Sequence, residues 1–555
     1  MRKQMSWKHG TEAVVAAKKI VGIVIGMTVA FGMAQGLRAD DFDWTNTTGV
    51  NHEWTNTANW FEGALPGAAD TVYFRNEATY AVHKADGLVD SVYVVKDAVT
   101  LTGNDTVDDD RGVPLVVTSR FVIGTEAGET ASLKLDQYKG LAVTNSGGTA
   151  EFKVGEAGTG SFDLNDGPVR PYPRGGLLVD HFIATNVAAM TLGQGNLTIK
   201  QGSTIDMNLA MSPLGGFNYM QVTLLAGTHD WTVDGLYLGS SAGSNGRLLV
   251  TGSGTVLNLD ADAHIRTRAG SGGRHSQLNV TAGATMNVTG DVDVTSRGAL
   301  TDQFSTLNIE DSDSTLNVAG SLTLGAWTAF DTPGTNRILI GNGALANVQG
   351  DVVVGVTANA GSDNTLWVQS GGTLRVTNTV TGGTIEVRRG LLAVDGLVDA
   401  DALTVETNGL LSGTGQIQAP ITIVGELSPG NSIGTLTVEG TVTLASDGVF
   451  KVELGASDTS DRLAITDGYL NLSSGGILSL VGTLDGSYTL ATFDTQTESY
   501  GTFSSVELNG STEDFATSGY AVTYGSDSIT LAIPEPGVLT LLAMGVGLLF
   551  LRRRC

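Results

Sequence analysis

The sequence contains very little cysteine, proline or positive charge. Its 555 residues include one cysteine, Cys555, and 11 prolines. A single cysteine cannot form a disulfide within the chain, and so few prolines exclude collagen-like and proline-rich classes. Charged residues make up only 16 %, and 57 acidic residues outnumber 31 basic ones. The acidic excess argues against binding nucleic acid through a basic face.

The sequence is rich in glycine and in short apolar segments. Glycine accounts for 75 residues and hydrophobic residues for 41 %, which is enough for a large core and excludes the highly charged disordered class. Apolar and polar residues alternate in short runs that Gly, Asn, Asp and Ser interrupt. This period of two is typical of strands with one buried face. Helical periodicity is almost absent outside the two hydrophobic ends.

The strand pattern repeats at a nearly constant interval. The residues that close six successive L-x-V-like segments are separated by 28, 30, 29, 31 and 28 residues. The closing residues are Val222, Val250, Val280, Ile309, Ile340 and Val368. We therefore predict an all-β fold, a right-handed parallel β-helix with coils of about 29 residues, and a series of β-sandwiches is the alternative.

One repeat shows the expected plan of a coil. Short strands are predicted at 278–280, 286–288 and 292–294, with Gly283 and Gly290 in the turns between them. We expect positive φ angles at both glycines. Inward Val, Leu and Ile would then stack from one coil to the next.

The N-terminal 39 residues are predicted to be an export signal. Lys18 and Lys19 precede an apolar run at 20–34, which is short for a membrane span. Small residues follow, and we place the cleavage after Ala39, with Gly36 as the other option. An uncleaved anchor is the alternative. In either case we expect Sec-type export machinery to carry the chain out of the cytoplasm.

The C-terminus has three parts in a fixed order. A Pro534-Glu535-Pro536 motif precedes an apolar run at 537–551, and Arg552, Arg553 and Arg554 follow. As a helix the run would span about 22 Å, less than a full hydrocarbon core. The arginines would stop the segment at the cytoplasmic side of the membrane.

This ending resembles the PEP-CTERM sorting signal of exported Gram-negative bacterial proteins. The resemblance implies processing by an exosortase-type enzyme at the Pro-Glu-Pro segment, with the single hydrophobic helix as a transient inner-membrane anchor. The mature chain would pass to the cell envelope, outer surface or medium. Such signals are associated with bacteria that make exopolysaccharide. A plain tail anchor is the alternative.

The region after residue 380 resembles the β-helical passengers of autotransporters and proteins with autotransporter-associated β-strand repeats. The run G-x-L-S-P-G-N-S-I-G-T-L at 425–436 carries the resemblance. Trp44, Trp54 and Trp60 look like the aromatic leader of that group. In place of the family's membrane barrel stands the Pro-Glu-Pro tail. We therefore divide the chain into an export signal (1–39), an aromatic leader or cap (40–103), a β-helical body (104–485), a β cap (486–533) and the sorting signal (534–555).

Residues that could carry chemistry are scattered. Asp260, Asp262 and His264 alternate and are expected to share one strand face, where a cation is conceivable but a solvated face is favoured. A small basic region is expected to be an outward loop, and an anion or glycan site is the alternative. The region consists of His264, Arg266, Arg268, Arg274 and His275. Asp291 and Asp293 would share a face, but Asp351 takes the place of Asp291 in a later repeat, which indicates a turn residue.

No motif for a metal, a nucleotide or a nucleophilic site is present, so we expect no catalytic residue, metal site or cofactor. The sequence favours a non-catalytic exported surface or matrix protein, an acidic rod acting in adhesion, coat structure or exopolysaccharide association. The alternative is an extracellular polysaccharide lyase or glycoside hydrolase on the same β-helix, which would need converging carboxylates.

Overall fold

A computed structural model describes residues 39–532, except 49–51, 84, 86, 103–114, 137–139, 166–175, 207–217, 239–243, 269–273, 298–302, 326–334, 356–362, 378–381, 457 and 495–499. The predicted signal helix and the hydrophobic helix of the tail therefore lie outside the described residues. Within the described part, no helix is long and apolar enough to cross a membrane.

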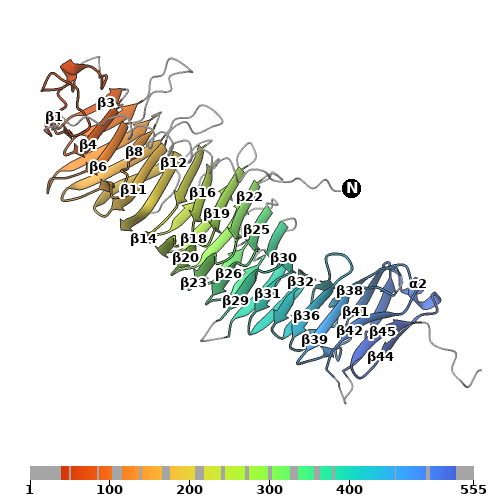
Figure 1. The fold of residues 1–555 in the computed structure, drawn as a ribbon. Coiled ribbons are helices and arrows are strands. Elements are labelled where there is room, and N and C mark those ends of the chain that lie inside the picture. Colours follow the sequence, from red (N-terminus) through yellow and green to blue (C-terminus); the bar gives the residue numbers. More distant parts are fainter. Residues whose placement is uncertain are drawn as a thin grey trace, which may run out of the picture.

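The protein is a parallel β-helix, as predicted, and forms an elongated rod (Figure 1). Each central coil contributes three strands, one to each of three parallel ladders. Ladder 1 contains β13 (Asn218–Leu224), β16 (Ser244–Thr251), β19 (Arg274–Thr281), β22 (Gln303–Ile309), β25 (Thr335–Ile340), β28 (Asp363–Val368), β35 (Glu426–Pro429), β38 (Val449–Leu454), β41 (Ile477–Gly482) and β43 (Ser505–Leu508).

Ladder 2 contains β14 (Thr228–Thr232), β17 (Val256–Asp260), β20 (Thr285–Val288), β23 (Thr315–Val318), β26 (Leu345–Val348), β29 (Thr373–Val376), β31 (Leu397–Asp399), β33 (Gln416–Gln418), β36 (Thr435–Glu439) and β39 (Arg462–Thr466). Ladder 3 contains β15 (Leu236–Leu238), β18 (Ala263–Arg268), β21 (Val292–Arg297), β24 (Leu322–Leu324), β27 (Val352–Val354), β34 (Ile421–Ile423), β37 (Val442–Leu444) and β40 (Leu470–Asn471). Two longer strands, β30 (Thr384–Val394) and β32 (Ala402–Gly413), contribute to both ladder 1 and ladder 3.

The first coils are built from β1 (Asp41–Asp43), β2 (Thr71–Phe74), β3 (Thr79–His83), β4 (Gly87–Val94), β5 (Ala98–Thr102), β6 (Leu115–Ile123), β7 (Thr130–Asp136), β8 (Leu141–Val143), β9 (Glu151–Val154), β10 (Thr159–Asn165), β11 (Gly176–Ala184) and β12 (Val187–Asp206), with the 3-10 turn η1 (Thr57–Asn59). At the other end, β42 (Tyr488–Thr492) pairs antiparallel with β45 (Ser528–Ala532), which pairs antiparallel with β44 (Ala521–Tyr524). The short helix α2 (Thr512–Thr517) packs against β43, the last strand of ladder 1.

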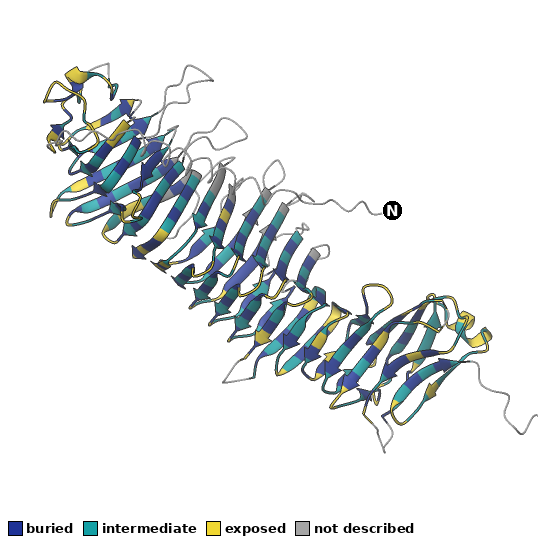
Figure 2. Cartoon of the chain, viewed as in Figure 1, coloured by how far each residue is buried: buried dark blue, intermediate teal, exposed yellow. Residues whose placement is uncertain are grey.

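The core is a continuous stack of inward side chains. Along most strands of the central coils, buried residues alternate with partly exposed ones (Figure 2). In ladder 1 the register places Leu278, Leu307, Ile338 and Leu366 directly over one another, and each is at most 1 % exposed. Because neighbouring coils bury each other's apolar faces, stability depends on the contact between successive coils.

The repeat alignment is confirmed from Val250 to Val368 but is wrong at its first member. Val250, Val280, Ile309, Ile340 and Val368 are successive register partners. Val250 pairs with Leu224, however, and not with Val222. The coil there is two residues shorter than the alignment assumed, and the coils around β32 are shorter still. Register partners are 18 or 19 residues apart between β30 and β32 and 16 apart between β32 and β35.

The two turn glycines of the analysed repeat have different reasons to be glycine. Gly283 has the predicted positive φ of 79°. Gly290 is not in that conformation, so its prediction is wrong. A Cβ atom at Gly290 would lie 2.0 Å from the Asp262 carboxylate of the preceding coil, so close approach between coils requires glycine there.

The predicted aromatic leader lies buried at the N-terminal end of the rod. Trp44, Trp54 and Trp60 are 1–3 % exposed. The Trp60 ring makes edge-to-face contacts with both others, at 5.0 Å from Trp44 and 4.8 Å from Trp54. Each of the strands β1, β2 and β4 nevertheless pairs parallel with the next, so these residues also form the first coils.

Candidate functional site

The predicted sorting residues lie outside the described part of the chain. These are Pro534, Glu535 and Pro536 with Arg552, Arg553 and Arg554. Ala39, the predicted last residue of the signal, is exposed and stands two residues before β1. Sorting, cleavage and the anchor therefore remain predictions from sequence.

The polar residues Asp260, Asp262 and His264 do not share one strand face, contrary to expectation. Asp260 ends β17, Asp262 lies in the following turn, and His264 is in β18. The chain turns a corner between ladders 2 and 3 there, so the alternation does not continue along one strand. Asp260 accepts a hydrogen bond from Thr289 Oγ1 at 2.8 Å, and Asp262 accepts one from the Asp291 amide at 2.7 Å.

Asp291 and Asp351 are turn residues, as their repetition indicated. The Asp291 carboxylate accepts a hydrogen bond from the Ser321 amide at 2.7 Å, in the next coil. Asp351 accepts hydrogen bonds from the Thr384 amide and hydroxyl at 3.3 and 2.9 Å. Asp291 precedes β21, whereas Asp293 lies within it, so these two carboxylates serve different neighbours.

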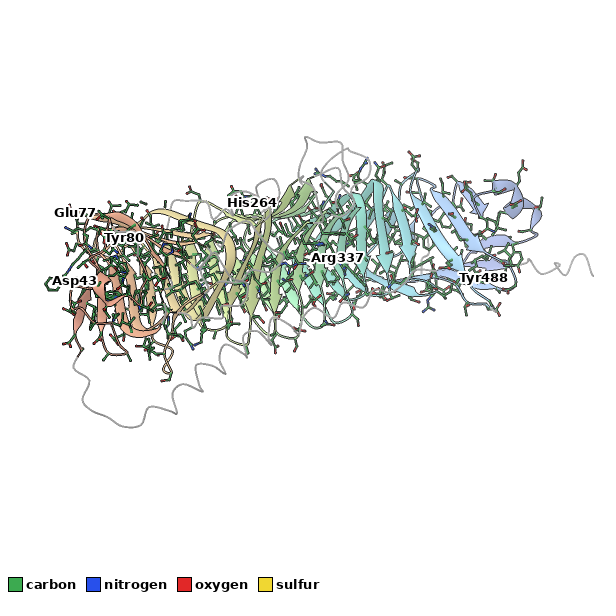
Figure 3. All side chains as sticks on the ribbon, turned by 90° about the horizontal axis from the view of Figure 1, so that it is seen from above. Asp43, Glu77, Tyr80, His264, Arg337 and Tyr488 are labelled. Atoms are coloured by element: carbon green, nitrogen blue, oxygen red, sulfur yellow. The ribbon has the colours of Figure 1, made fainter. Side chains whose placement is uncertain are left out.

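Asp293 pairs with His264 across neighbouring coils, a contact that the sequence analysis missed. The Asp293 carboxylate contacts His264 Nδ1, and the His264 ring stacks on Tyr237 at 4.6 Å. Figure 3 locates His264 along the rod. The sequence signal that could have revealed this contact is the spacing of 29 residues between His264 and Asp293, which equals one coil. The predicted basic loop is also wrong, because Arg266 and Arg268 belong to β18, and Arg274 begins β19.

A serine–histidine pair lies inside the core between ladder strands β12 and β14. Ser203 Oγ and His229 Nδ1 are 2.8 Å apart, and Trp231 Nε1 donates to Ser203 Oγ at 2.8 Å. Because Ala226 O, 3.0 Å from His229 Nε2, can only accept, the imidazole carries its proton on Nε2. His229 is fully buried and Ser203 is 6 % exposed. The pair resembles a nucleophile and its base, but no substrate reaches it in this position.

Burial dominates the protonation of this imidazole. Desolvation lowers the pKa of His229 from 6.5 to about 4. The residue is therefore neutral at physiological pH, as its two hydrogen bonds require.

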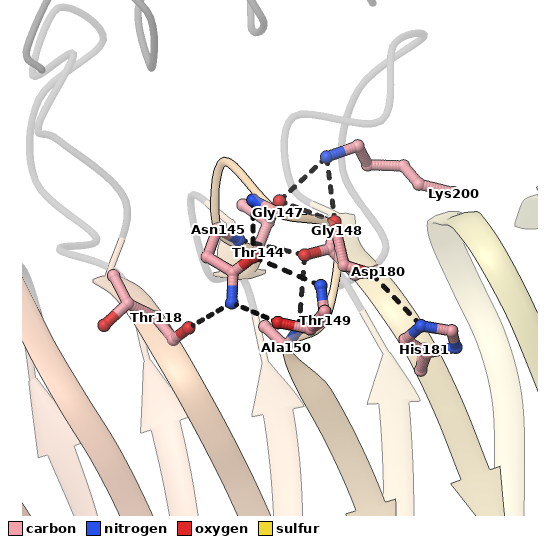
Figure 4. Close-up of polar contacts among 10 residues, drawn as sticks. All are labelled: Thr118, Thr144, Asn145, Gly147, Gly148, Thr149, Ala150, Asp180, His181 and Lys200. Carbon is pink, nitrogen blue, oxygen red and sulfur yellow. Dashed lines mark hydrogen bonds and ion pairs between the residues drawn. The ribbon is translucent and has the colours of Figure 1, made fainter.

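A second buried polar network fixes the loop between β8 and β9 (Figure 4). Asp180, which is fully buried, sits at a register irregularity of β11. Its carboxylate accepts from Lys200 Nζ and Thr144 Oγ1 at 2.8 Å and from the amides of Asn145 and Ala150 at 2.9 and 3.3 Å. All these donors belong to the chain itself, so the carboxylate serves as a structural anchor.

Ladder 2 carries a row of asparagines on its outer side. Each amide donates to the acceptor one coil earlier, at 2.7–2.8 Å, and the row ends on the Asp230 carboxylate. The members are Asn258, Asn287, Asn317 and Asn347. These side-chain amides therefore form hydrogen bonds between neighbouring coils. Among the described residues, no three His, Cys, Asp or Glu side chains gather as a metal-binding group.

Comparison with known proteins gives short or distant matches. No protein-family model matches the chain. It is 37 % identical over 95 residues to the extracellular serine protease of Serratia marcescens. That match spans 17 % of this chain and only 9 % of the protease. A solved, hyper-glycosylated TibA fragment, modified by TibC, is 14 % identical with a TM-score of 0.19, over 75 % of this chain and 98 % of the fragment. The fold assignment rests on the strand register and not on this likeness.

Proposed function

We propose that the protein is a non-catalytic, exported rod of the cell surface or extracellular matrix, sorted by its C-terminal tail. Its roles would be adhesion, coat structure or association with exopolysaccharide. The observation that carries the proposal is that polar side chains on the outer side of the rod form hydrogen bonds between neighbouring coils. The asparagine row of ladder 2 is the example. These bonds link successive coils along the rod, as a structural role requires.

Export is supported by the two ends of the sequence and by the relative from Serratia, whose name describes an extracellular protein. The 95 matched residues are a small part of that protease, so its proteolytic activity is not carried over.

The sorting hypothesis is tested by intact mass and cell fractionation of the native chain. The matched variant changes Pro534, Glu535 and Pro536 to alanine. A control changes Glu513 and Asp514 to alanine, because both are exposed on α2 and near the tail in sequence.

Loss of the tail in the native chain and the control, but not in the Pro-Glu-Pro variant, would support sorting to the surface or medium. An intact tail in all three would refute exosortase-type processing and leave the tail-anchor alternative. N-terminal sequencing of the same material checks the cleavage predicted after Ala39.

A further inference from the structure

The first strand of the rod is held at its start by one carboxylate. β1 pairs parallel with β2 through three residues of each strand. Directly before β1, the backbone nitrogen of Asp40 donates to Asp70 Oδ1 at 3.1 Å, and the Asp40 carbonyl accepts from the Thr71 amide at 3.0 Å. Figure 3 labels Asp43, the last residue of β1, at the N-terminal end of the rod. Asp70 thus binds the residue that leads into the first coil.

Asp70 is itself fixed by the loop and the strand around it. Its Oδ2 accepts from the Gly67 amide at 2.7 Å, and its own amide donates to the Gly67 carbonyl at 3.0 Å. The Asp70 carbonyl accepts from the amide of Asp90, within β4, at 3.0 Å. The Asp90 carboxylate has a donor of its own, because it accepts from Ser119 Oγ at 2.6 Å. Asp70 Oδ1 is therefore held in position for Asp40 by two other segments of the chain.

The strand that Asp70 holds carries part of the buried aromatic cluster. Phe42, in β1, is 6 % exposed, and Trp44, which follows β1, is 1 % exposed. The end coil of a solenoid has a neighbour on one side only, so it opens more easily than the central coils. Fraying of β1 would expose both rings to water, and a firm attachment at Asp40 opposes it.

The predicted cleavage point of the export signal lies directly before this contact. Ala39 and Asp40 are both exposed. Hydrolysis of the bond between them would consume one water and leave a carboxylate on Ala39 and an α-ammonium on Asp40. The new cation is the same nitrogen that donates to Asp70 Oδ1. Cleavage therefore turns a neutral donor into a charged one at hydrogen-bond distance from a carboxylate, which adds a Coulomb attraction.

We propose that Asp70 is the acceptor for the new N-terminus of the mature chain, so that removal of the export signal fixes β1 to the rod. Peptide amines are recognised elsewhere in proteins by acceptors held in this way. The inference rests on the proposed export of the chain. It assigns the cut to the bond after Ala39, because a cut after Gly36 would place the amine on Leu37, three residues before Asp40.

The other charges at this end of the rod also favour an ammonium. Asp41 follows the amine directly in β1 and adds a negative charge beside it. Asp43 pairs with Arg75 at 2.5 Å, so this cation is already neutralised, and Glu62 accepts from the Asp43 amide at 3.1 Å. Nearby carboxylates raise the pKa of an amine. We therefore expect the α-amine of Asp40 to stay protonated above its ordinary pKa of about 8.

The test compares four chains that run to Cys555, two that start at Asp40 and two that start at Leu37, each with Asp70 or with Asp70→Asn. Asparagine keeps the acceptor oxygen and the shape but removes the charge. Acylation of the α-amine near pH 7, followed by mass spectrometry, reports its protonation, because only the neutral amine reacts. Asp70→Asn should speed acylation about 3- to 10-fold in the Asp40 chain, which corresponds to a pKa lowered by about 0.5 to 1. In the Leu37 chain the change should be less than about 2-fold, and Asp514→Asn, on exposed α2, should change neither chain.

Hydrogen exchange of β1 in the same four chains measures the attachment of the strand. Peptides that cover β1 should exchange about 2- to 5-fold more slowly in the Asp40 chain than in the Leu37 chain, because exposed ion pairs are weak but opening of an end strand is local. Asp70→Asn should remove this difference. The comparison is a double-mutant cycle, so any loss of β1 protection that Asp70→Asn causes in both chains cancels.

Equal acylation rates with Asp70 and with Asp70→Asn in the Asp40 chain would overturn the proposal. So would equal β1 protection in the Asp40 and Leu37 chains, or native protein that starts at Met1 or Leu37 by N-terminal sequencing. The four-chain cycle requires neither export nor a processed tail. Its failure would therefore refute the amine contact alone, whereas cell fractionation and intact mass test export and sorting.

Discussion

Acidification should open the rod locally at His229. The fold keeps this imidazole neutral, with Nδ1 accepting from Ser203 and Nε2 donating to Ala226. A proton on Nδ1 would face Ser203 Oγ, which already accepts from Trp231. Because the folded-state pKa is depressed from 6.5 to about 4, the stabilisation is complete above pH 6.5 and is lost as the pH falls toward 4. The loss is about 2 kcal/mol by pH 5 and about 3 kcal/mol below pH 4.

Hydrogen exchange measured by mass spectrometry is the suitable assay, because coils contact only their neighbours and the rod need not unfold as one unit. After correction for the intrinsic exchange rate, peptides from β12 and β14 should lose protection between pH 7.5 and pH 5. Peptides from β26 and β27 serve as the reference within the chain. His229→Gln should abolish the pH dependence, whereas His181→Gln, at a partly exposed site, should preserve it. Equal pH dependence in the native chain and in His229→Gln would refute the reasoning.

Three further changes test other contacts between coils. Asp180→Ala leaves the Lys200 ammonium and two amides without their carboxylate, so urea unfolding should show a loss of about 3 kcal/mol, and native-like stability would contradict the anchor role. Gly227→Ala would place a Cβ atom 1.4 Å from a carbonyl oxygen of β12, so the free energy of unfolding should fall by about 3 kcal/mol or more. Gly254→Ala is the control, because Gly254 also has a positive φ but faces open space, and it should lower the free energy of unfolding by about 1 kcal/mol in the same assay. Burial raises the pKa of Asp461 to about 6, so its contribution is complete below pH 3.8 and is lost as the pH rises through 6. Protection of β36 and β38 should therefore be about 1 kcal/mol greater at pH 5 than at pH 7.5, opposite in sign to the histidine effect, and unchanged protection would refute it.

The architecture could be predicted from sequence because it follows from local periodicity. Alternation of apolar and polar residues fixes which side chains point inward, and the interval between Val250 and Val280 fixes the coil. Coil length could not be predicted everywhere. The coil between Leu224 and Val250 is shorter than the average, and the coils around β32 are shorter still. Turn length depends on close approaches such as that of Gly290 to Asp262, which involve residues of another coil.

The same uncertainty explains why the polar clusters were missed. His264 and Asp293, Ser203 and His229, and Trp367 and Asp395 are separated by 29, 26 and 28 residues, each about one coil. A known period would nominate such pairs, but not the side of the sheet on which they meet. A register error of one residue exchanges the inner and outer faces of a strand. In β14 that error would exchange buried His229 with outward Asp230, and so turn a structural core pair into an apparent surface dyad. The chemistry of a solenoid therefore becomes readable from sequence only when every coil length is known to the residue.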